Sequence, residues 1–197
     1  MLTKLRKIVA NKILYPIAKK LASIGLSPNT ITVIGLLFSI LYLASMYVEK
    51  LELAVFFILA SGVMDALDGA VAKVTGKTTK LGAFLDSTID RIEDSIFILG
   101  LSFLKFESLL IYVFLALSLM ISYMRARGES LGLKLEGVGV MERSERIIAV
   151  FLIVIVSSFS YEVAHFILYA TIALSLITFV QRFFFITNSL TLKEQNT

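Results

Sequence analysis

Residues 64–94 read MDALDGAVAKVTGKTTKLGAFLDSTIDRIED, and this stretch carries Asp65, Asp68, Asp86 and Asp90 inside a strongly apolar chain. Asp65 and Asp68 are three residues apart and Asp86 and Asp90 are four apart, so each pair occupies one face of a helix. The segment between the pairs is short and contains Gly76, which predicts two adjacent antiparallel helices. We therefore expect the four carboxylates to converge.

Carboxylate oxygens without histidine or cysteine select hard divalent cations such as Mg²⁺, Mn²⁺ or Ca²⁺. A pair of such ions can hold a diphosphate and stabilise charge on its oxygens. Gly69 and Gly82 would leave the helix surfaces bare, so that a ligand can approach. Alternatively, Asp65 and Asp68 cap a helix or pair with Lys73 and Arg91, and the glycines serve helix packing, but this explains one pair at a time and not the convergence.

The composition indicates a membrane protein. Hydrophobic residues make up 57% of the 197 residues, charged residues 17%, and the mean hydropathy is +0.87, whereas soluble domains are about half apolar and about a quarter charged. Stretches close to the roughly 20 residues that cross a bilayer as a helix recur along the chain. We predict an all-α integral membrane protein with six transmembrane helices, at 30–48, 51–70, 86–104, 107–126, 145–161 and 163–187.

Basic residues set the expected topology. Residues 1–24 alternate lysine and arginine with apolar residues, which predicts an amphipathic interfacial helix. With both termini in the cytoplasm, all lysines and arginines except Lys50 and Lys105 fall on the cytoplasmic side. We predict a single domain, 1–197, in the plasma membrane, with the six-helix bundle at 25–187, a fraying polar tail at 188–197 and the active site on the cytoplasmic face.

The counts of cysteine and histidine and the net charge limit the possible metal sites, catalytic groups and partners. The chain has no cysteine and a single histidine, His165, which argues against thiolate metal sites and histidine-based catalysis. The net charge is +4. Basic residues that face anionic lipid headgroups account for most of this charge, so no nucleic-acid partner is expected.

The run from Asp65 to Asp90 resembles the signature of the CDP-alcohol phosphotransferases, DxxDGxxAR-x8-GxxxDxxxD. Every fixed position agrees except one, because Lys73 stands where the family has arginine. The resemblance implies a transferase that moves a phosphatidyl or archaetidyl group from a CDP-linked lipid to an alcohol and releases CMP. It also implies a homodimer and two Mg²⁺ or Mn²⁺ ions held by Asp65, Asp68, Asp86 and Asp90, with Asp90 acting as general base.

The same resemblance implies which residues bind the CDP-linked lipid: Asn29, Thr32, Asp65, Gly69, Lys73, Thr79 and Gly82. Lys73 keeps the positive charge but lacks the planar fork of arginine, so only a single-point phosphate contact is expected. Residues 27–32, SPNTIT, resemble the Pro-Asn-x-x-Thr run that precedes the first span in the family. Asn29 and Thr32 either contact the nucleotide, or the run serves only as a helix cap, with Ser27 or Asn29 at the N-cap and Pro28 in the first turn.

A second polar segment, residues 122–146, carries the candidates for binding the acceptor: Arg125, Lys134, Arg143 and Arg146. Arginines gathered at opposing helix ends suit a phosphate monoester, which predicts a phosphorylated polyol acceptor. SYMRARGESLG and GVMERSER resemble family members that use inositol phosphate, and glycerol 3-phosphate is the alternative acceptor. The tendency of basic residues to lie in cytoplasmic loops would also explain this segment.

Two rival functions use acidic residues in membranes. A prenyltransferase would need more spans and a second aspartate-rich motif. A divalent-cation transporter, the alternative of another class, would show internal repeats and helix breaks near the midplane. Here the prolines are confined to Pro16 and Pro28 and the acidic groups gather near one end of their helices, which favours the transferase.

Overall fold

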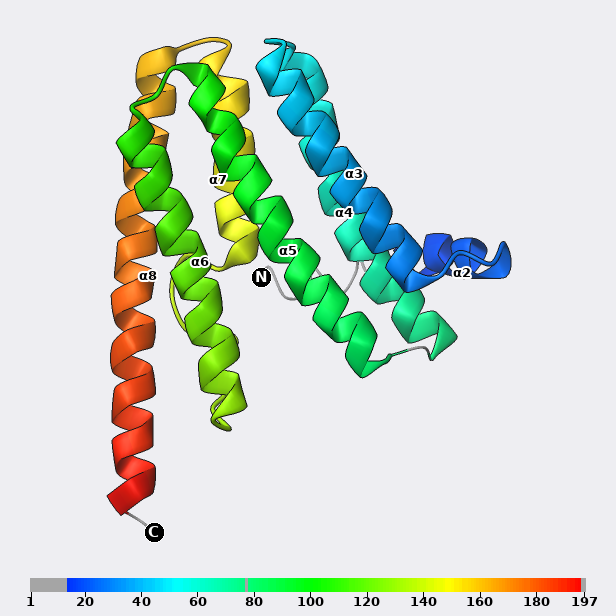
Figure 1. Cartoon of the computed structure of the whole chain (residues 1–197), viewed down its shortest axis with the longest axis vertical. Helices are drawn as coiled ribbons and strands as arrows, with labels where there is room; N and C mark the ends of the chain where they lie inside the picture. Colours follow the sequence, from blue (N-terminus) through cyan, green and yellow to red (C-terminus); the bar gives the residue numbers. More distant parts are fainter. Residues whose placement is uncertain (1–13, 77, 196–197) are drawn as a thin grey trace. The chain divides into compact units, whose positions relative to one another are not determined.

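The computed structural model describes residues 14–76 and 78–195, and this part of the chain is helical without strands. Its elements are α2 (Tyr15–Ser23), α3 (Pro28–Tyr47), α4 (Leu51–Thr75), α5 (Lys80–Gly100), the 3₁₀ helix η2 (Leu101–Leu104), α6 (Ser108–Ser130), α7 (Arg143–Ser157) and α8 (Tyr161–Gln195) (Figure 1). The prediction of an all-α fold is confirmed for these residues.

The chain divides into two compact units. The first comprises residues 1–45 and 52–96, and thus holds α2, α4 and most of α3 and α5. The second comprises residues 46–51 and 97–197, and in it α8 packs along both α6 and α7.

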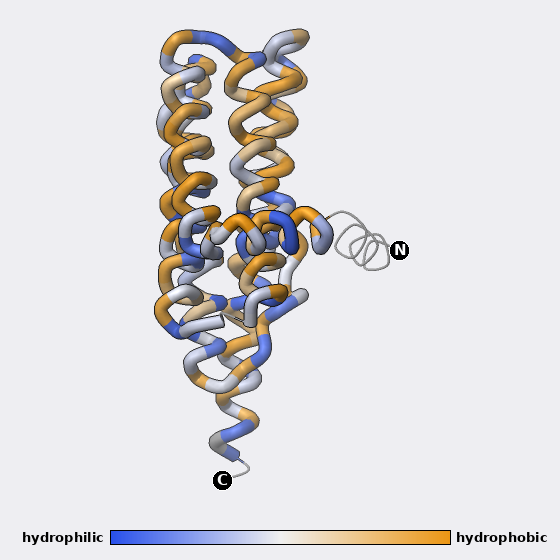
Figure 2. Tube along the Cα trace, turned by 90° about the vertical axis from the view of Figure 1, so that its right-hand side faces the viewer, coloured by the Kyte–Doolittle hydropathy of each residue, from blue (hydrophilic) through white to orange (hydrophobic). Residues whose placement is uncertain are grey.

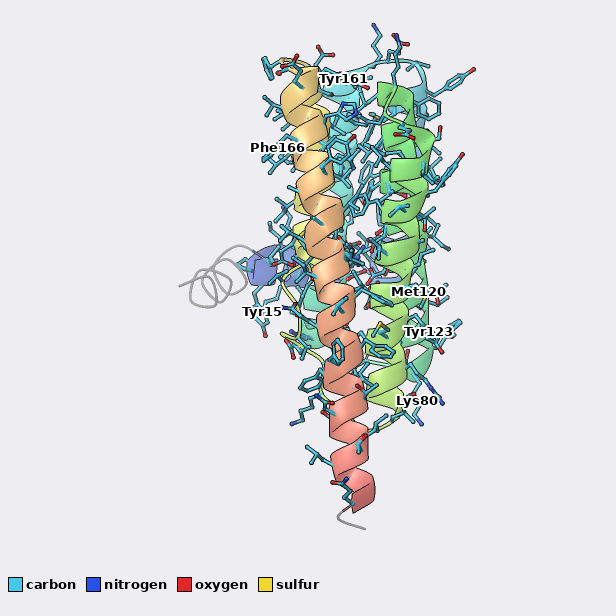
Figure 3. All side chains as sticks on the ribbon, turned by 90° about the vertical axis from the view of Figure 1, so that its left-hand side faces the viewer. Tyr15, Lys80, Met120, Tyr123, Tyr161 and Phe166 are labelled. Carbon is cyan, nitrogen blue, oxygen red and sulfur yellow. The ribbon has the colours of Figure 1, made fainter. Side chains whose placement is uncertain are left out.

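Among the described residues, four helices are long and apolar enough to cross a membrane: α3, α4, α6 and the Tyr161–Lys193 part of α8. Figure 2 shows hydrophobic residues along most of the length of the long helices. Large apolar side chains point outward, such as Phe166 on α8 and Tyr123 on α6, which are 72% and 60% exposed (Figure 3). Exposed apolar surface of this extent is what lipid hydrocarbon covers, so the chain is a membrane protein.

The structure does not confirm the other two predicted spans. The stretch at 86–104 corresponds to α5 and η2, where Asp86, Asp90 and Glu93 lower the hydropathy of the helix. The stretch at 145–161 corresponds to α7, whose 15 residues extend about 22 Å, less than the roughly 30 Å of a bilayer core.

The chain ends were predicted as an interfacial helix and a polar tail. Residues 1–13 of the predicted interfacial helix lie outside the described residues, and the described remainder forms α2. Ala18 of α2 is buried against Ile31, Leu67 and Val71 of α3 and α4. The tail expected to fray from residue 188 instead continues α8 to Gln195, because leucine, lysine and glutamate favour helix and no glycine or proline interrupts the segment.

Candidate active site

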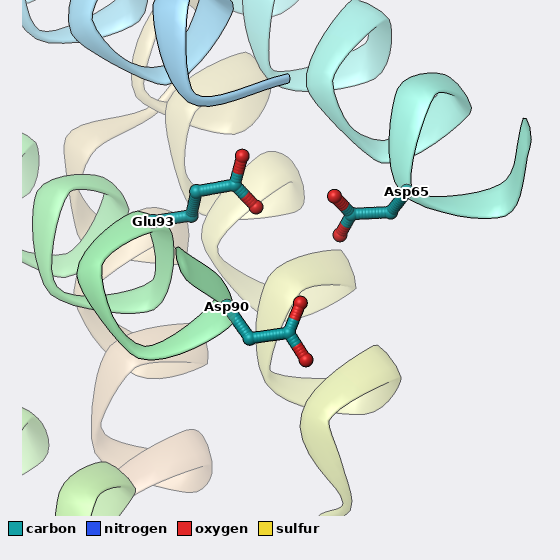
Figure 4. A group of neighbouring side chains, drawn as sticks. All are labelled: Asp65, Asp90 and Glu93. Carbon is teal, nitrogen blue, oxygen red and sulfur yellow. The ribbon is translucent and has the colours of Figure 1, made fainter. Parts of the chain in front are cut away.

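Three acidic side chains of the first unit form one group. Asp65 on α4 and Asp90 and Glu93 on α5 each offer a carboxylate oxygen, and these oxygens lie within 4.8 Å of one another. Figure 4 shows the three carboxylates turned toward one another across the space between the two helices. The predicted convergence of acidic residues from two neighbouring helices is confirmed for Asp65 and Asp90.

Glu93 is the member of this group that the sequence analysis missed. It lies three residues after Asp90, so the two side chains occupy the same face of α5. The signal was present in the run DRIED at 90–94, in which an acidic residue follows Asp90 at helical spacing. The side chain of Glu93 is fully buried, which is costly for a carboxylate unless it is paired or coordinated.

The other two aspartates lie beside a small pocket in the same unit. Asp68 is buried and accepts a hydrogen bond of 2.7 Å from the hydroxyl of Thr32, which belongs to α3. Asp86 is exposed, and both Asp86 and Asp65 lie near enough for their charges to act on Asp68. The four predicted aspartates therefore belong to one electrostatically connected region, which Glu93 extends.

The pocket has a volume of about 150 Å³ and opens between the first turns of α3 and the facing ends of α4 and α5. Of the residues predicted to bind the CDP-linked lipid, five line it, together with Asp68 and Asp86: Asn29, Thr32, Gly69, Thr79 and Gly82. Asp65 lies in the acidic group instead. Lys73 is exposed in the last turn of α4 and is not one of the lining residues.

Capping residues begin two of the helices that border this pocket. The hydroxyl of Ser27 accepts a hydrogen bond from the backbone N–H of Thr30 and caps α3, while the hydroxyl of Thr79 accepts one from Gly82 and caps α5. Ser27 thus fills the capping role expected within SPNTIT, whereas Asn29 and Thr32 line the pocket. Capping therefore belongs to Ser27, and the nucleotide contact of Asn29 and Thr32 stays a prediction.

Gly69 provides an open wall of the pocket. A Cβ added at Gly69 would meet nothing within 4 Å, so the backbone of α4 is accessible there. A Cβ added at Gly82 would instead lie 3.1 Å from the hydroxyl of Thr79 and 3.4 Å from the side-chain oxygen of Asn29. The first glycine leaves room for a ligand, and the second permits close packing around the pocket.

The predicted acceptor residues belong to the second unit. Arg146 is buried and donates hydrogen bonds to the carbonyl of Met141 (3.1 Å) and the hydroxyl of Ser122 (3.2 Å). Arg125 pairs with Glu129 at 3.0 Å on the same helix. Lys134 is exposed in the loop after α6, and Arg143 is half-buried at the start of α7. Arg146 thus helps to hold the loop in place, in addition to carrying charge.

Arg182 is a further buried arginine, which the sequence analysis counted only among the basic residues on the cytoplasmic side. It donates hydrogen bonds to the carbonyl of Val138 (2.9 Å) and to that of Ile121 (2.8 Å). The nearby hydroxyl of Thr178 accepts one from the backbone N–H of Met141. An arginine inside a long apolar helix was the available signal, because such residues are retained only with polar partners.

The chain is similar to proteins of a known family. The family model of the CDP-alcohol phosphatidyltransferases matches residues 25–180. The chain belongs to this family. The match covers α3 to α7 and most of α8, and thus includes the acidic group and the pocket.

Two relatives of this phosphatidyltransferase are inositol-type synthases. It is 38% identical over 185 residues to an archaetidylinositol phosphate synthase of Pyrococcus horikoshii, covering 92% of this chain and 94% of the relative. It is 35% identical over 147 residues to a phosphatidylinositol phosphate synthase of Mycobacterium tuberculosis, covering 71% of this chain and 67% of the relative.

Solved structures of the latter enzyme resemble the phosphatidyltransferase described here. A crystal structure with CDP-DAG bound has a TM-score of 0.79 and 32% identity and covers 89% of this chain and 94% of that chain. Another, in complex with manganese and citrate, has a TM-score of 0.79 and 32% identity and covers 88% of both chains.

The donor atoms of this phosphatidyltransferase fit a divalent metal. The group offers carboxylate oxygens from Asp65, Asp90 and Glu93 at mutual distances that one hard cation can bridge. Such a cation, when bound, neutralises diphosphate charge and improves the nucleotide as a leaving group. The residue types and their spacing thus agree with the manganese reported for the mycobacterial relative.

Proposed function

We propose that this phosphatidyltransferase moves a phosphatidyl or archaetidyl group from a CDP-linked lipid to a hydroxyl of a phosphorylated polyol and releases CMP, with inositol phosphate as acceptor. The observation that supports it most is the combination of an acidic group and an adjoining pocket within α3, α4 and α5. The inositol-type names of the relatives support the choice of acceptor.

In this proposal the pocket binds the cytidine diphosphate part of the donor. This part of the donor contacts five residues at the pocket: Asn29, Thr32, Gly69, Thr79 and Gly82. Lys73 provides a single positive charge near the cytoplasmic end of α4. Asp65, Asp68, Asp86 and Asp90 hold two Mg²⁺ or Mn²⁺ ions. Thr32 orients the carboxylate of Asp68 through the hydrogen bond of 2.7 Å.

The reaction is an in-line displacement at phosphorus. The hydroxyl oxygen of the acceptor bonds to the phosphorus that carries the lipid, the bond from that phosphorus to the CMP oxygen breaks, and Asp90 takes the hydroxyl proton. Arg125, Lys134, Arg143 and Arg146 supply positive charge for the acceptor's own phosphate. The lipid chains remain in the bilayer throughout.

We further propose six spans, with both termini and the active site on the cytoplasmic side of the plasma membrane, and a homodimer. The two units then form one membrane domain. Family membership argues against the cation-transporter and prenyltransferase alternatives, since the matched family carries out phosphatidyl transfer.

A transfer assay on the purified protein in detergent tests the proposal. The assay supplies a CDP-linked lipid, Mg²⁺ or Mn²⁺, and labelled inositol phosphate, glycerol 3-phosphate or serine in separate reactions, and it measures CMP and labelled lipid. We expect turnover with inositol phosphate. Turnover with glycerol 3-phosphate alone would support the alternative acceptor, and activity with serine alone would contradict the role given to the arginines.

The role of Asp90 requires a separate variant. Asp90→Asn keeps the size of the side chain but removes its ability to accept the proton, so we expect CMP release to fall by at least a thousandfold, on the order of the contribution of a general base. Binding of the CDP-linked lipid should remain measurable. Loss of both together would show that Asp90 serves chiefly as a metal ligand.

A further inference from the structure

The acidic residues of the site divide into two sets. Asp68 and Asp86 line the pocket assigned to the donor, whereas Asp65 and Asp90 form a separate group with Glu93. Glu93 lies outside the signature quoted above, yet its carboxylate occupies this group from a fully buried position. The set with Asp90 and Glu93 lies farther along α5 than Asp86 and is called the deeper group below.

The separations in the deeper group suit a single ion. Carboxylate oxygens bind Mg²⁺ at about 2.1 Å and Ca²⁺ at about 2.3–2.6 Å, so two oxygens on opposite sides of one ion lie roughly 4–5 Å apart. The oxygens of Asp65, Asp90 and Glu93 lie within 4.8 Å of one another. They can therefore share a cation with small side-chain adjustments.

Neighbouring residues hold Glu93 in this orientation. The hydroxyl of Ser61 on α4 donates a hydrogen bond of 3.3 Å to Glu93 Oε1. On the other side, a Cβ added at Gly35 of α3 would lie 3.1 Å from the same oxygen and 3.6 Å from Asp65 Oδ1. Glycine at this position lets the backbone of α3 approach the two carboxylates, and partners of this kind fix the orientation of metal ligands.

We infer that Glu93 is a metal ligand and completes, with Asp65 and Asp90, the second cation position of the site. The inference rests on the proposed function only in assuming that the site holds two divalent ions. It extends the ligand set beyond the four aspartates of the signature, and it accounts for a charged residue retained in the buried face of α5.

Manganese binding to the purified protein in detergent, without lipid substrate, tests this inference. Free Mn²⁺ is titrated by electron paramagnetic resonance for the unmodified chain, for Glu93→Gln and for Glu52→Gln, an exposed acidic residue in the first turn of α4 that serves as the control. We expect Glu93→Gln to weaken one of the two bound ions by about tenfold or more and to leave the other intact. Unchanged affinity and stoichiometry would overturn the inference.

Folding and function are controlled separately. If Glu93→Gln fails to fold by circular dichroism, Glu93→Asp replaces it; its carboxylate is withdrawn by one methylene, so we again expect weaker binding of one ion, and unchanged affinity again overturns the inference. If Glu93→Gln weakens one of two bound Mn²⁺ ions but the unmodified chain releases no CMP, the proposed function fails and the inference stands. If it releases CMP while the Glu93 variant binds Mn²⁺ normally, the inference alone fails.

Discussion

Gly69 keeps the wall of the donor pocket free of side chains. Because a Cβ at this position meets nothing within 4 Å, Gly69→Ala should fold normally and gain up to about 1 kcal/mol from its higher helix propensity. The added methyl group would nevertheless project into the space for the nucleotide. We expect the affinity for a CDP-linked lipid to fall by about tenfold, measured by isothermal titration in detergent micelles.

Gly62 provides the matched control for this change. It also lies on α4, and a Cβ there also meets nothing within 4 Å, but it does not line the pocket. Gly62→Ala should raise or preserve the melting temperature and leave lipid binding unaltered. Equal effects of both variants on lipid binding would contradict the role given to Gly69.

Thr32 links the donor pocket to the acidic residues. Its hydroxyl donates to Asp68 at 2.7 Å and lies 3.1 Å from the carbonyl of Pro28. Thr32→Val preserves the shape of the side chain but removes the donor, so Asp68 loses the group that orients it. We expect Mn²⁺ affinity to fall by about tenfold, and Thr32→Ser to restore it; a purely structural role would lower thermal stability without changing metal affinity.

At the scale of elements, α8 anchors the loop between α6 and α7 through Arg182. Arg182→Met would remove the hydrogen bonds to the carbonyls of Val138 and Ile121, each worth roughly 1.5–3 kcal/mol when the donor is charged. We expect backbone amides of residues 135–141 to exchange hydrogen at least tenfold faster. The exposed neighbour Gln181 supplies the control, since Gln181→Met should leave exchange in the loop unchanged.

The absence of cysteine makes the topology of the whole molecule directly testable. Lys50 and Lys134 are exposed in different interhelical loops, and the proposed orientation places Lys50 outside and Lys134 in the cytoplasm. In intact cells, Lys50→Cys should react with a membrane-impermeant maleimide. Lys134→Cys should react only after permeabilisation, and the opposite pattern would reverse the proposed orientation.

Hydropathy and helical spacing, both read directly from the sequence, predicted much of this structure. Hydropathy identified the helical membrane class, and helical spacing placed Asp65 with Asp68 and Asp86 with Asp90, each pair on one face of its helix, whatever the rest of the chain does. Hydropathy was a weaker guide where charge or length competes with it, as in α5 and α7, whose spans stay predictions. At the polar end of α8, helix propensity continues the helix to Gln195.

The helices, the family motif and the acidic character of the site thus follow from the order of residues alone. Packing in three dimensions was needed to show that Glu93 joins Asp65 and Asp90, that Ser27 caps α3 while Thr32 bonds to Asp68, and that Arg182 holds the loop after α6. The physical reason is that these contacts join residues on different helices or loops. Their distances depend on how closely the backbones pack, which glycines such as Gly35 permit and no local spacing rule encodes.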